Sequence, residues 1–479
     1  MVSNGGYSYD PVIMNKPTPA PSFARPAFVD EARQTLDALV KAHPDIAFVD
    51  AMIADICGTL RGKRLPVRGT GHLFESGMQI PQSIYMMDAS GEMVNPFGRG
   101  FGDGDPDGTA WPIPETISRV WGEEPPRAQM LTTLRDPSGT VHPAEPLAAL
   151  ERVLERFAEL KLRPVAALEL EFYLIDKERG ENGQPQPPID PASGKRESTN
   201  SVYGIDDLDR YGVFTRALTE AAAVQGLPLS AVSSEYAPGQ FEANLKHQED
   251  AIRAADHCVF LKQVITAAAK HAGFDATFMA KPYPDRAGTG LHVHVSVLDE
   301  QGRNIFDDGS EHGSDQLRHA IGGMQKLMPG SMALFAPSIN SYRRFQPDMF
   351  APVNRRWGHN NRSVGLRIPM SPGVARRVEH RVAGADANPY LTLAGVLAGL
   401  HYGLMNRVDP GAKAEGNVSR EPDLALPFNL LDAIEKLESE SAIGDYLGAE
   451  TVAFYAETKR LEHKRFAKII SAAEYSWYL

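Results

Sequence analysis

The sequence predicts an α+β protein with a small N-terminal domain and a larger second domain. The chain of 479 residues is long enough for two cores, and its 42% hydrophobic and 23% charged residues are typical of a soluble globular protein. Strand-like and helix-like patterns alternate, and residues 167–174 and 288–297 alternate strictly between apolar and polar side chains. No apolar run in the sequence approaches the roughly 20 residues that cross a bilayer, so we expect no membrane partner.

Charge and cysteine content narrow the classes of partner and compartment. A net charge of −12 argues against nucleic acid as the main partner, because a phosphate backbone requires a basic surface. The two cysteines, Cys57 and Cys258, cannot form a disulfide framework and lack the spacing of a zinc site. The proline-rich N-terminus does not have the order of charged and apolar residues that marks a signal peptide. We therefore expect a cytoplasmic protein.

We expect residues 1–27 to form a flexible N-terminal arm and residues 28–137 to form a strand-rich domain. Residues 28–43 have helical spacing of apolar side chains, and residues 46–56 have the pattern of a strand that ends in a turn at Gly58. Residues 97–111 are rich in glycine and predict a loop, in which Asp103, Asp105 and Asp107 form a surface turn.

A Pro-Ser-Gly sequence at residues 137–139 places the domain boundary near residue 138, so the second domain covers residues 138–479. A helix begins near Glu145, with Leu147, Leu150, Leu154 and Phe157 at helical spacing. Residues 177–200 are polar and predict a loop. Residues 251–271 predict a long helix that is apolar on most faces and mostly buried.

Two pairs of carboxylates are candidate metal ligands. Glu169 and Glu171 share one face of the strand at residues 167–174, because alternate side chains of a strand point the same way. Glu235 and Glu242 lie on either side of a Pro-Gly turn. Carboxylates held this close repel one another, and a hard divalent cation is their natural partner. Taken alone, a pair such as Glu169 and Glu171 more often belongs to a strand that has one solvated face, and the rest of the chain changes that balance.

Residues 288–297 place His292, His294 and Ser296 on one strand face. Hydrogen-bonded structural histidines are one interpretation, and metal ligands are the other. A zinc hydrolase would use both imidazoles with one carboxylate. The four carboxylates on similar strands instead favour Mg²⁺ or Mn²⁺ with a single imidazole.

Arginines gather in short segments of the second domain, namely Arg343, Arg344, Arg362, Arg367, Arg376, Arg377 and Arg381. Arg377, Glu379 and Arg381 share one strand face, so that a carboxylate lies between two guanidinium groups. A single surface arginine is usually solvated, but several between apolar strands suit the recognition of phosphate or carboxylate. Beside a divalent metal, such a cluster predicts phosphoryl transfer.

From the segment around Asp55 to residues 474–479, the chain resembles the glutamine synthetase family. The resemblance rests on motifs in the family's order: Asn340-Ser341-Tyr342-Arg343-Arg344, Asn361-Arg362-Ser363, Arg367-Ile368-Pro369, Arg377-Val378-Glu379 and Ala387-Asn388-Pro389-Tyr390. It implies a beta-grasp domain over residues 28–137 and a catalytic domain over residues 138–479, whose curved antiparallel sheet forms a two-ended active-site channel. It also implies a homo-oligomer, usually a dodecamer of two hexameric rings with sites between neighbouring subunits.

The resemblance implies two or more Mg²⁺ or Mn²⁺ ions in each site, with glutamate, an amine and ATP as substrates. The implied ligands are Glu171, Glu235 and Glu242 for the metal that organises the amino acid, and Glu169, His292 and Glu379 for the metal that bridges the ATP phosphates. In the implied reaction, the γ-phosphoryl group moves from ATP to the side-chain carboxylate of glutamate. An amine then attacks the resulting acyl phosphate.

The resemblance also assigns the remaining site residues by role. The roles are glutamate binding for Glu171, Gly288, Arg344 and Arg381, contact with the transferring phosphoryl group for Arg362 and Arg367, and nucleotide binding for His294, Ser296, Arg367 and Arg377. Asp55 matches the residue that reaches into a neighbour's site and accepts a proton from the amine. Together with Asp348 and Phe350 it forms the implied amine pocket.

Departures from the family pattern favour a substrate other than ammonia. Phe350 stands where ammonia-using members have a glutamate, Ala287 replaces an asparagine and Val374 replaces a basic residue. The segment after Asp409 lacks the Asn-Leu-Tyr motif that enterobacterial glutamine synthetases adenylylate, so we do not expect that regulation. Four segments resemble the gamma-glutamylpolyamine synthetase (glutamate–putrescine ligase) branch, namely residues 55–58, 60–63, 105–107 and 477–479.

Three alternatives stay open beside this ATP-dependent glutamate–amine ligase. The first is a glutamine synthetase that uses ammonia. The second is a catalytically silent relative with a structural or regulatory role. All six ligand positions are intact, which argues against it. The third, a zinc hydrolase, would leave the arginines without a role.

Overall fold

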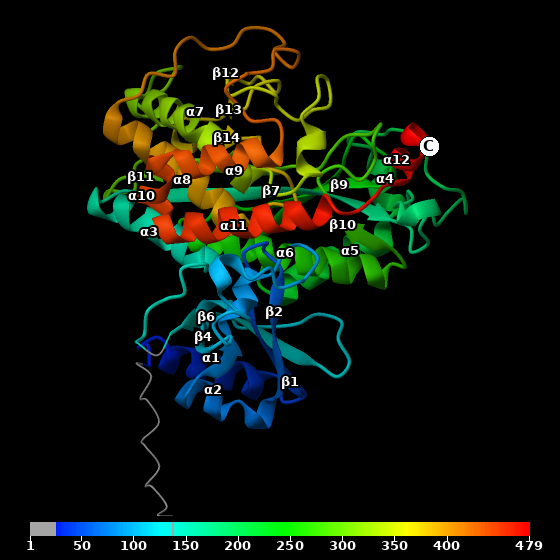
Figure 1. The fold of residues 1–479 in the computed structure, drawn as a ribbon, viewed down its shortest axis with the longest axis vertical. Helices are drawn as coiled ribbons and strands as arrows, with labels where there is room; N and C mark the ends of the chain where they lie inside the picture. Colours follow the sequence, from blue (N-terminus) through cyan, green and yellow to red (C-terminus); the bar gives the residue numbers. More distant parts are fainter. Residues whose placement is uncertain (1–24, 137) are drawn as a thin grey trace, which may run out of the picture.

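The computed structural model describes residues 25–136 and 138–479, so residues 1–24 of the predicted N-terminal arm lie outside the described residues. The described chain forms a small sheet unit and a larger unit beside it (Figure 1). The predicted boundary at residue 138 falls in the connection between these units. Among the described residues, the helices are all too short or too polar to cross a bilayer.

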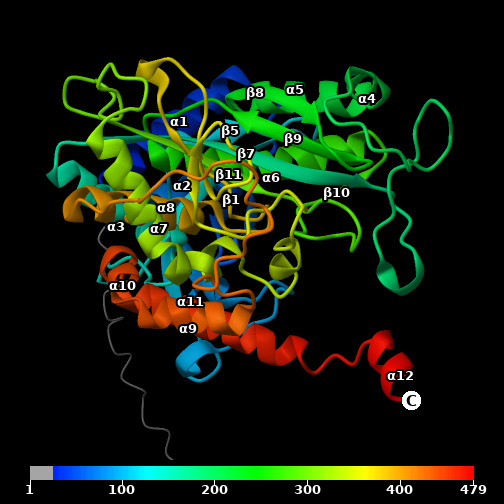
Figure 2. The same ribbon diagram turned by 90° about the horizontal axis from the view of Figure 1, so that it is seen from above.

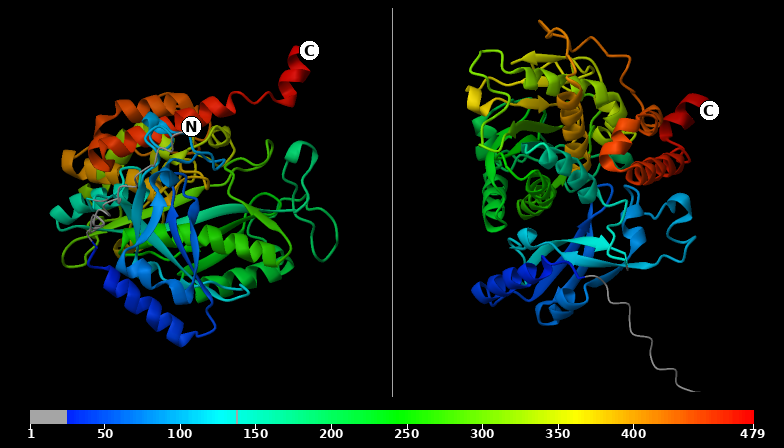
Figure 3. Two further views of the ribbon diagram at one scale, coloured as in Figure 1. Left: turned by 60° about the horizontal axis from the view of Figure 1, so that its bottom comes forward. Right: turned by 90° about the vertical axis from the view of Figure 1, so that its left-hand side faces the viewer.

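The small unit is a mixed sheet covered by two helices. Its elements are α1 (Val29–Ala42), β1 (Phe48–Ala54), β2 (Leu60–Pro66), α2 (Gly71–Glu75), β3 (Met78–Pro81), β4 (Asp107–Pro112), β5 (Ser118–Arg119) and β6 (Arg127–Arg135). The strand order is β2-β1-β6-β4-β3, and β1 pairs antiparallel with β2 but parallel with β6. Figures 1 and 3 place α1 and α2 on the outer side of the sheet, away from the larger unit. The predicted helix at residues 28–43 and strand at residues 46–56 are confirmed, each to within two residues of its ends.

The predicted loop at residues 97–111 is wrong in its last part, because Asp107–Pro112 is strand β4 between β3 and β6. Its glycine marks a close approach of side chains and not a turn. A Cβ atom on Gly108 would lie 2.9 Å from Cγ of Leu134 on the neighbouring strand. Glycine content alone does not distinguish these two uses.

The larger unit packs helices against one long sheet. Its strands are β7 (Arg163–Ile175), β8 (Leu229–Ser234), β9 (Gln240–Leu245), β10 (Asp275–Thr277), β11 (Leu291–Leu298), β12 (Trp357–His359), β13 (Leu366–Ile368) and β14 (Val378–His380). The order is β12-β13-β14-β11-β7-β9-β8, with β10 paired to β7. The predicted antiparallel sheet is confirmed except at β12 and β13, which pair in parallel and make the sheet mixed.

Helices fill the space behind and beside this sheet. They are α3 (Pro146–Glu159), α4 (Ile205–Arg210), α5 (Gly212–Val224), α6 (Ala251–His271), α7 (Asp315–Phe335), α8 (Pro389–Asn406), α9 (Leu430–Ser439), α10 (Ser441–Leu447), α11 (Ala449–Phe466) and α12 (Ala472–Tyr478). The helix predicted at residues 251–271 is α6, which packs against β7 and β9. The apolar side chains of β7 and β11 therefore face a helical layer, and their polar side chains face away from it.

The two units are tied together beneath the large sheet. Asn388 caps the N-terminus of α8, and its side-chain amide donates to the carbonyl oxygens of Asp55 at 3.0 Å and Ile56 at 3.3 Å. Arg465 near the end of α11 pairs with Asp88 of the small unit. Beyond α11, the chain leads to α12, which lies away from the body (Figure 2).

Candidate active site

The register of four strands brings the predicted ligands onto one face of the large sheet. His292 on β11 lies opposite Glu169 on β7, and Glu171 on β7 lies opposite Glu242 on β9. On the other side of β11, Glu379 on β14 lies opposite His294. Directly opposite side chains of antiparallel strands are within reach of one another, so strand pairing alone assembles this cluster.

These side chains line a cavity of about 810 Å³. The predicted site residues that line it are Glu169, Glu171, Glu235, Glu242, Gly288, His292, His294, Arg344, Phe350, Arg362, Arg367, Arg377, Glu379 and Arg381. A second cavity, of about 800 Å³, lies between residues 88–90 and α11. We assign the chemistry to the first cavity, because there carboxylates, imidazoles and guanidinium groups converge.

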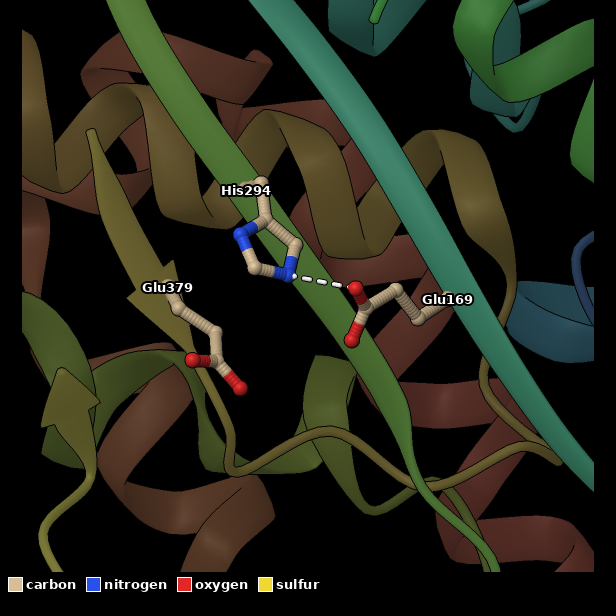
Figure 4. Close-up of side chains that lie close together, drawn as sticks. All are labelled: Glu169, His294 and Glu379. Atoms are coloured by element: carbon tan, nitrogen blue, oxygen red, sulfur yellow. Dashed lines mark ion pairs between the residues drawn. The ribbon is translucent and has the colours of Figure 1, made fainter. Parts of the chain in front are cut away.

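Carboxylates and imidazoles approach to within ligand-sharing distance. His292 Nδ1 lies 3.6 Å from Glu169, 3.9 Å from Glu242 and 3.9 Å from Glu379, and its Nε2 lies 4.0 Å from Glu171. Glu169, Glu242 and His292 each offer a ligand atom within 4.8 Å of the others, as do Glu169, His294 and Glu379. Figure 4 shows the second group, with Glu169 and Glu379 on opposite sides of His294.

The pKa values of these carboxylates are shifted, upward for some of them and downward for others. Burial and the charges of neighbouring carboxylates raise the pKa of Glu242 to about 9 and that of Glu235 to about 7. For Glu169, burial is outweighed by hydrogen bonds from His292 and His294, which hold its pKa well below the usual value. Burial is the larger cause of both raised pKa values, and repulsion between neighbouring carboxylates adds to it.

The two histidines differ in the groups that their ring nitrogens contact. Arg377 Nε donates a hydrogen bond of 3.1 Å to Nδ1 of His294, so a neutral His294 carries its proton on Nε2. That Nε2 lies 3.0 Å from Glu169, within ion-pair distance of its carboxylate. His294 is therefore less suited to bind a metal than His292, although both lie close to Glu169 and Glu379.

The donor set fits a hard divalent cation. Five carboxylates and one imidazole, from Glu169, Glu171, Glu235, Glu242, Glu379 and His292, give an oxygen-rich site of the kind that Mg²⁺ and Mn²⁺ prefer. Thiolates are not part of it among the residues that line the cavity, and a single usable imidazole is fewer than a zinc hydrolase site uses.

Guanidinium groups border the metal-type cluster on one side. Arg367 pairs with Glu379 at 2.7 Å, and Arg381 pairs with the other oxygen of the same carboxylate. Arg362 donates to the hydroxyl group of Tyr203 at 3.1 Å. These groups bring positive charge to the cavity, and guanidinium groups of this kind pair well with phosphate and carboxylate groups.

The side chain of Arg344 packs closely against the backbone of Gly288. Arg344 is 3% exposed, its Nη1 donates to the carbonyl of Val382 at 3.1 Å, and its buried Nε has no hydrogen-bond partner among the described residues. A Cβ atom on Gly288 would lie 2.6 Å from Cγ of Arg344, so only glycine permits this approach. A buried donor of this kind needs an acceptor, and a substrate carboxylate can supply it.

Of the described residues predicted for the site, three do not line the cavity: Asp55, Ser296 and Asp348. Ser296 is buried further along β11, opposite Val165. Asp348 accepts hydrogen bonds from Arg420 Nε at 2.7 Å and Ser419 at 2.9 Å, and lines an adjoining cavity.

Asp55 is fully buried in its own chain. Its carboxylate accepts from the backbone N–H groups of Cys57 at 2.9 Å and Thr59 at 2.8 Å, and from Arg61 Nε at 2.6 Å. These contacts stabilise the turn between β1 and β2. The role of proton acceptor in a neighbour's site stays a prediction, and it would require the pair with Arg61 to open.

Two aromatic side chains that the sequence did not indicate complete the cavity. Tyr203 is the partner of Arg362, and the ring of Tyr236 lies 4.9 Å from that of Phe350, centroid to centroid. Tyr236 directly follows Glu235, and this position beside a predicted ligand was the available signal. Tyr203 lies in a connection whose course the sequence pattern does not determine.

The chain is similar to several known proteins. Residues 143–478 match the model of the glutamine synthetase catalytic domain. The chain is 38% identical to the gamma-glutamylputrescine synthetase PuuA of Escherichia coli (strain K12), over 95% of each chain. It is 31% identical to the glutamate–isopropylamine ligase of a Pseudomonas species, over 89% of this chain and 93% of that one. The solved structure of apo GmaS superimposes with a TM-score of 0.79 at 28% identity, and the match covers 92% of this chain and 98% of that chain. This chain therefore belongs to the glutamine synthetase family, a family of glutamate–amine ligases.

Proposed function

We propose that this protein uses ATP to join the γ-carboxylate of glutamate to a primary alkylamine or diamine such as putrescine. The observation that carries the proposal is the convergence of carboxylates, two imidazoles and arginines on a single cavity, with an aromatic side chain, Phe350, in its wall. Carboxylate-held metals and guanidinium groups are the recurring parts of phosphoryl transfer sites.

The residues present divide the reaction between them. The guanidinium groups of Arg344 and Arg381 bind the carboxylates of glutamate, and those of Arg362 and Arg367 face the phosphoryl group in transfer. Mg²⁺ or Mn²⁺ held by the ligand set would supply neutralisation of the ATP phosphates.

The amine side of the cavity supports an alkylamine. Phe350 and Tyr236 form a contiguous aromatic wall there, and each exposes ring surface to a ligand. Ammonium is small and charged and gains little from such a wall, whereas methylene groups are buried against it. The names of the Escherichia coli and Pseudomonas relatives, a putrescine and an isopropylamine enzyme, point to the same substrate class.

The second candidate is a glutamine synthetase that uses ammonia. The observation in its favour is the 30% identity to the glutamine synthetase of Thermotoga maritima over 74% of this chain. Against it stands the aromatic side chain at position 350. A catalytically silent relative is disfavoured by the intact ligand set.

We also propose a ring-shaped homo-oligomer, the dodecamer implied by the resemblance. Exposed apolar side chains at the end of α11 and on α12 support self-association, among them Phe466, Ile469, Trp477 and Leu479. Mass photometry of the purified protein tests the proposal. A monomer at micromolar concentration would contradict it.

Release of ADP with glutamate and a panel of amines tests the function. The panel contains ammonia, methylamine, butylamine, putrescine and spermidine, and mass spectrometry identifies the product. We expect a higher kcat/KM for at least one primary amine than for ammonia. If ammonia is as good a substrate as every amine in the panel, the protein is a glutamine synthetase. If ADP is released with none of them, the ligase proposal fails.

A further inference from the structure

A further cavity of about 730 Å³, here called the flap cavity, adjoins the active-site cavity across the segment formed by residues 348–351, which we call the flap. The two cavities share Phe350, Ala351, Asn360 and Arg362 as lining residues. Residues 414–419 form the other side of the flap cavity. A molecule that occupies the active site at one end can therefore extend past Phe350 into the flap cavity.

The flap presents different side chains to the two cavities. Phe350 lines both of them, whereas Asp348 lines only the flap cavity. Both residues have a left-handed backbone, with φ of 62° at Asp348 and 65° at Phe350, so the chain turns sharply between them. An apolar partition is thus followed, two residues away, by a carboxylate on the far side.

Asp348 is the only carboxylate among the described residues that line the flap cavity. The rest of the polar lining is neutral or basic, with His359, Asn361, Arg362 and Asn417 among it. A cation that enters the flap cavity has one charged acceptor to bind, and it is Asp348. The hydrogen bond from Arg420, followed by that from Ser419, holds the pKa of Asp348 below its usual value, so the group is a carboxylate at neutral pH.

The present partner of Asp348 is weakly held. Arg420 Nε lies 2.7 Å from Asp348, but the Arg420 side chain is 79% exposed and that of Asp348 is 45% exposed. Ion pairs at such exposure contribute little, because solvent screens them and both side chains lose rotamer freedom. A primary ammonium group that arrives from the active-site side can replace the guanidinium group with little net loss of interaction.

We propose that the flap cavity is the subsite for the distal ammonium group of a diamine or polyamine, and that Arg420 occupies Asp348 until this ammonium group displaces it. The inference rests on the proposed function and adds to it a discrimination by length and charge. The reacting amine lies in the active-site cavity, the methylene chain crosses Phe350, and the distal ammonium group reaches Asp348. A monoamine of the same length has no group that competes with Arg420.

Steady-state kinetics with matched amines test the subsite. Putrescine and butylamine have the same carbon chain and differ only in the distal ammonium group. For putrescine, we expect Asp348→Asn to raise KM by about two- to fivefold and Arg420→Gln to lower it by a similar factor, the range that an exposed ion pair supports. For butylamine, we expect both variants to leave KM unchanged. Arg420→Lys restores the cation and should return the putrescine KM toward that of the wild type.

A matched control removes an equally exposed arginine elsewhere. Arg303 is 76% exposed and pairs with Asp299 at 2.8 Å outside both cavities, so Arg303→Gln should change neither KM. If the wild type uses amines but the Asp348 and Arg420 variants change both amines equally or neither, the subsite is wrong and the ligase proposal stands. If the wild type uses ammonia and no amine, both proposals fall.

Discussion

Glu379 is the side chain at which the arginines and imidazoles of the site meet. It is 1% exposed, one carboxylate oxygen pairs with Arg367 at 2.7 Å, and the other pairs with Arg381 and lies 3.9 Å from His292. Burial alone would raise its pKa, but the charges of Arg381 and His292 outweigh it and lower the pKa to about 2. Glu379 is thus ionised throughout the neutral range and available as a ligand.

Replacement of this carboxylate should abolish turnover. We expect Glu379→Gln to lower kcat for ADP release by about 100-fold or more, because changes around a metal site that leave the ligands intact already cost 10- to 100-fold. The control is Glu421→Gln, which removes an exposed carboxylate paired with Arg356. Thermal unfolding of both variants reports on folding. A folded Glu379→Gln protein with the activity of the control would remove Glu379 from the ligand set.

The raised pKa of Glu242 makes the stability of the metal-free protein depend on pH. A carboxyl group with a folded-state pKa of about 9 binds its proton more tightly in the folded chain than in the unfolded chain, where the value is 4.5. Its stabilising contribution to the free energy of unfolding is therefore fully present below pH 4.5 and is lost as the pH rises toward 9. We expect the Tm without divalent cations to fall over this range, and added Mg²⁺ to reduce the fall.

The variant Glu242→Gln isolates this effect. Glu145, whose pKa burial raises to about 8, titrates over the same range in both proteins. Glu235, whose pKa burial and neighbouring carboxylates raise to about 7, titrates in this range as well. The difference between the wild type and Glu242→Gln without metal therefore reports Glu242 together with its effect on these neighbours. Differential scanning calorimetry should show a smaller fall of Tm with pH in the variant. Parallel curves for the two proteins would contradict the assignment.

At the scale of elements, strand register positions the candidate ligands, and the flap contributes an aromatic side chain. The register of β7, β9, β11 and β14 places Glu169, Glu171, Glu242 and His292 together. A slip by one residue would turn every one of them into the helical layer, so the apolar faces of these strands hold the ligand set in place. The flap adds Phe350 to this rigid base, with a ring that is 60% exposed.

A charge at position 350 should shift substrate choice toward ammonia. Each methylene group buried against the ring of Phe350 contributes about 0.8 kcal/mol, or about fourfold in kcat/KM. We expect Phe350→Glu to lower kcat/KM for butylamine and to raise the ratio of ammonia to butylamine by about tenfold or more. Phe350→Leu keeps an apolar wall and should leave the ratio within a few-fold of the wild type. An unchanged ratio in Phe350→Glu would show that the flap does not contact the amine.

At the scale of the whole molecule, the small unit is attached to the large one through the turn that contains Asp55. The carbonyl group of Asp55 accepts from Asn388 at the start of α8, and its carboxylate is satisfied by two N–H groups and Arg61. The catalytic role implied by the resemblance and the structural role of these contacts make opposite predictions.

Asp55→Asn separates the two roles. The amide oxygen still accepts from Cys57 and Thr59, but the ion pair with Arg61 is lost. The structural role predicts a loss of about 1–3 kcal/mol in the free energy of unfolding and a kcat close to that of the wild type. A loss of kcat by 100-fold with an unchanged Tm would instead show that Asp55 accepts a proton. Activity recovered on mixing inactive Asp55→Ala and Arg362→Ala chains would place that step in a neighbouring subunit.

Local sequence patterns predicted those parts of the fold and site that depend on a single element. Period-two alternation put Glu169 with Glu171 and His292 with His294, and helical spacing predicted α6 at the residues where it lies. Such patterns report which face of an element is buried, because burial selects apolar side chains at the period of that element. The sequence pattern did not predict strand β4. Its glycine permits the close approach of a neighbouring strand, and such an approach is not a local property of the sequence.

The sequence by itself determined the residue types of the site, their sharing of strand faces and, through motifs, the family. Only the tertiary structure decided which strands are neighbours, and thus that Glu169 faces His292. It also decided that Asp348 pairs with Arg420, 72 residues further along the chain, and that Asp55 is buried against Arg61. These outcomes follow from non-local packing and charge pairing, in which residues distant in sequence compete for the same partner. Such competition produces no periodic pattern in the sequence, so the sequence alone does not predict its result.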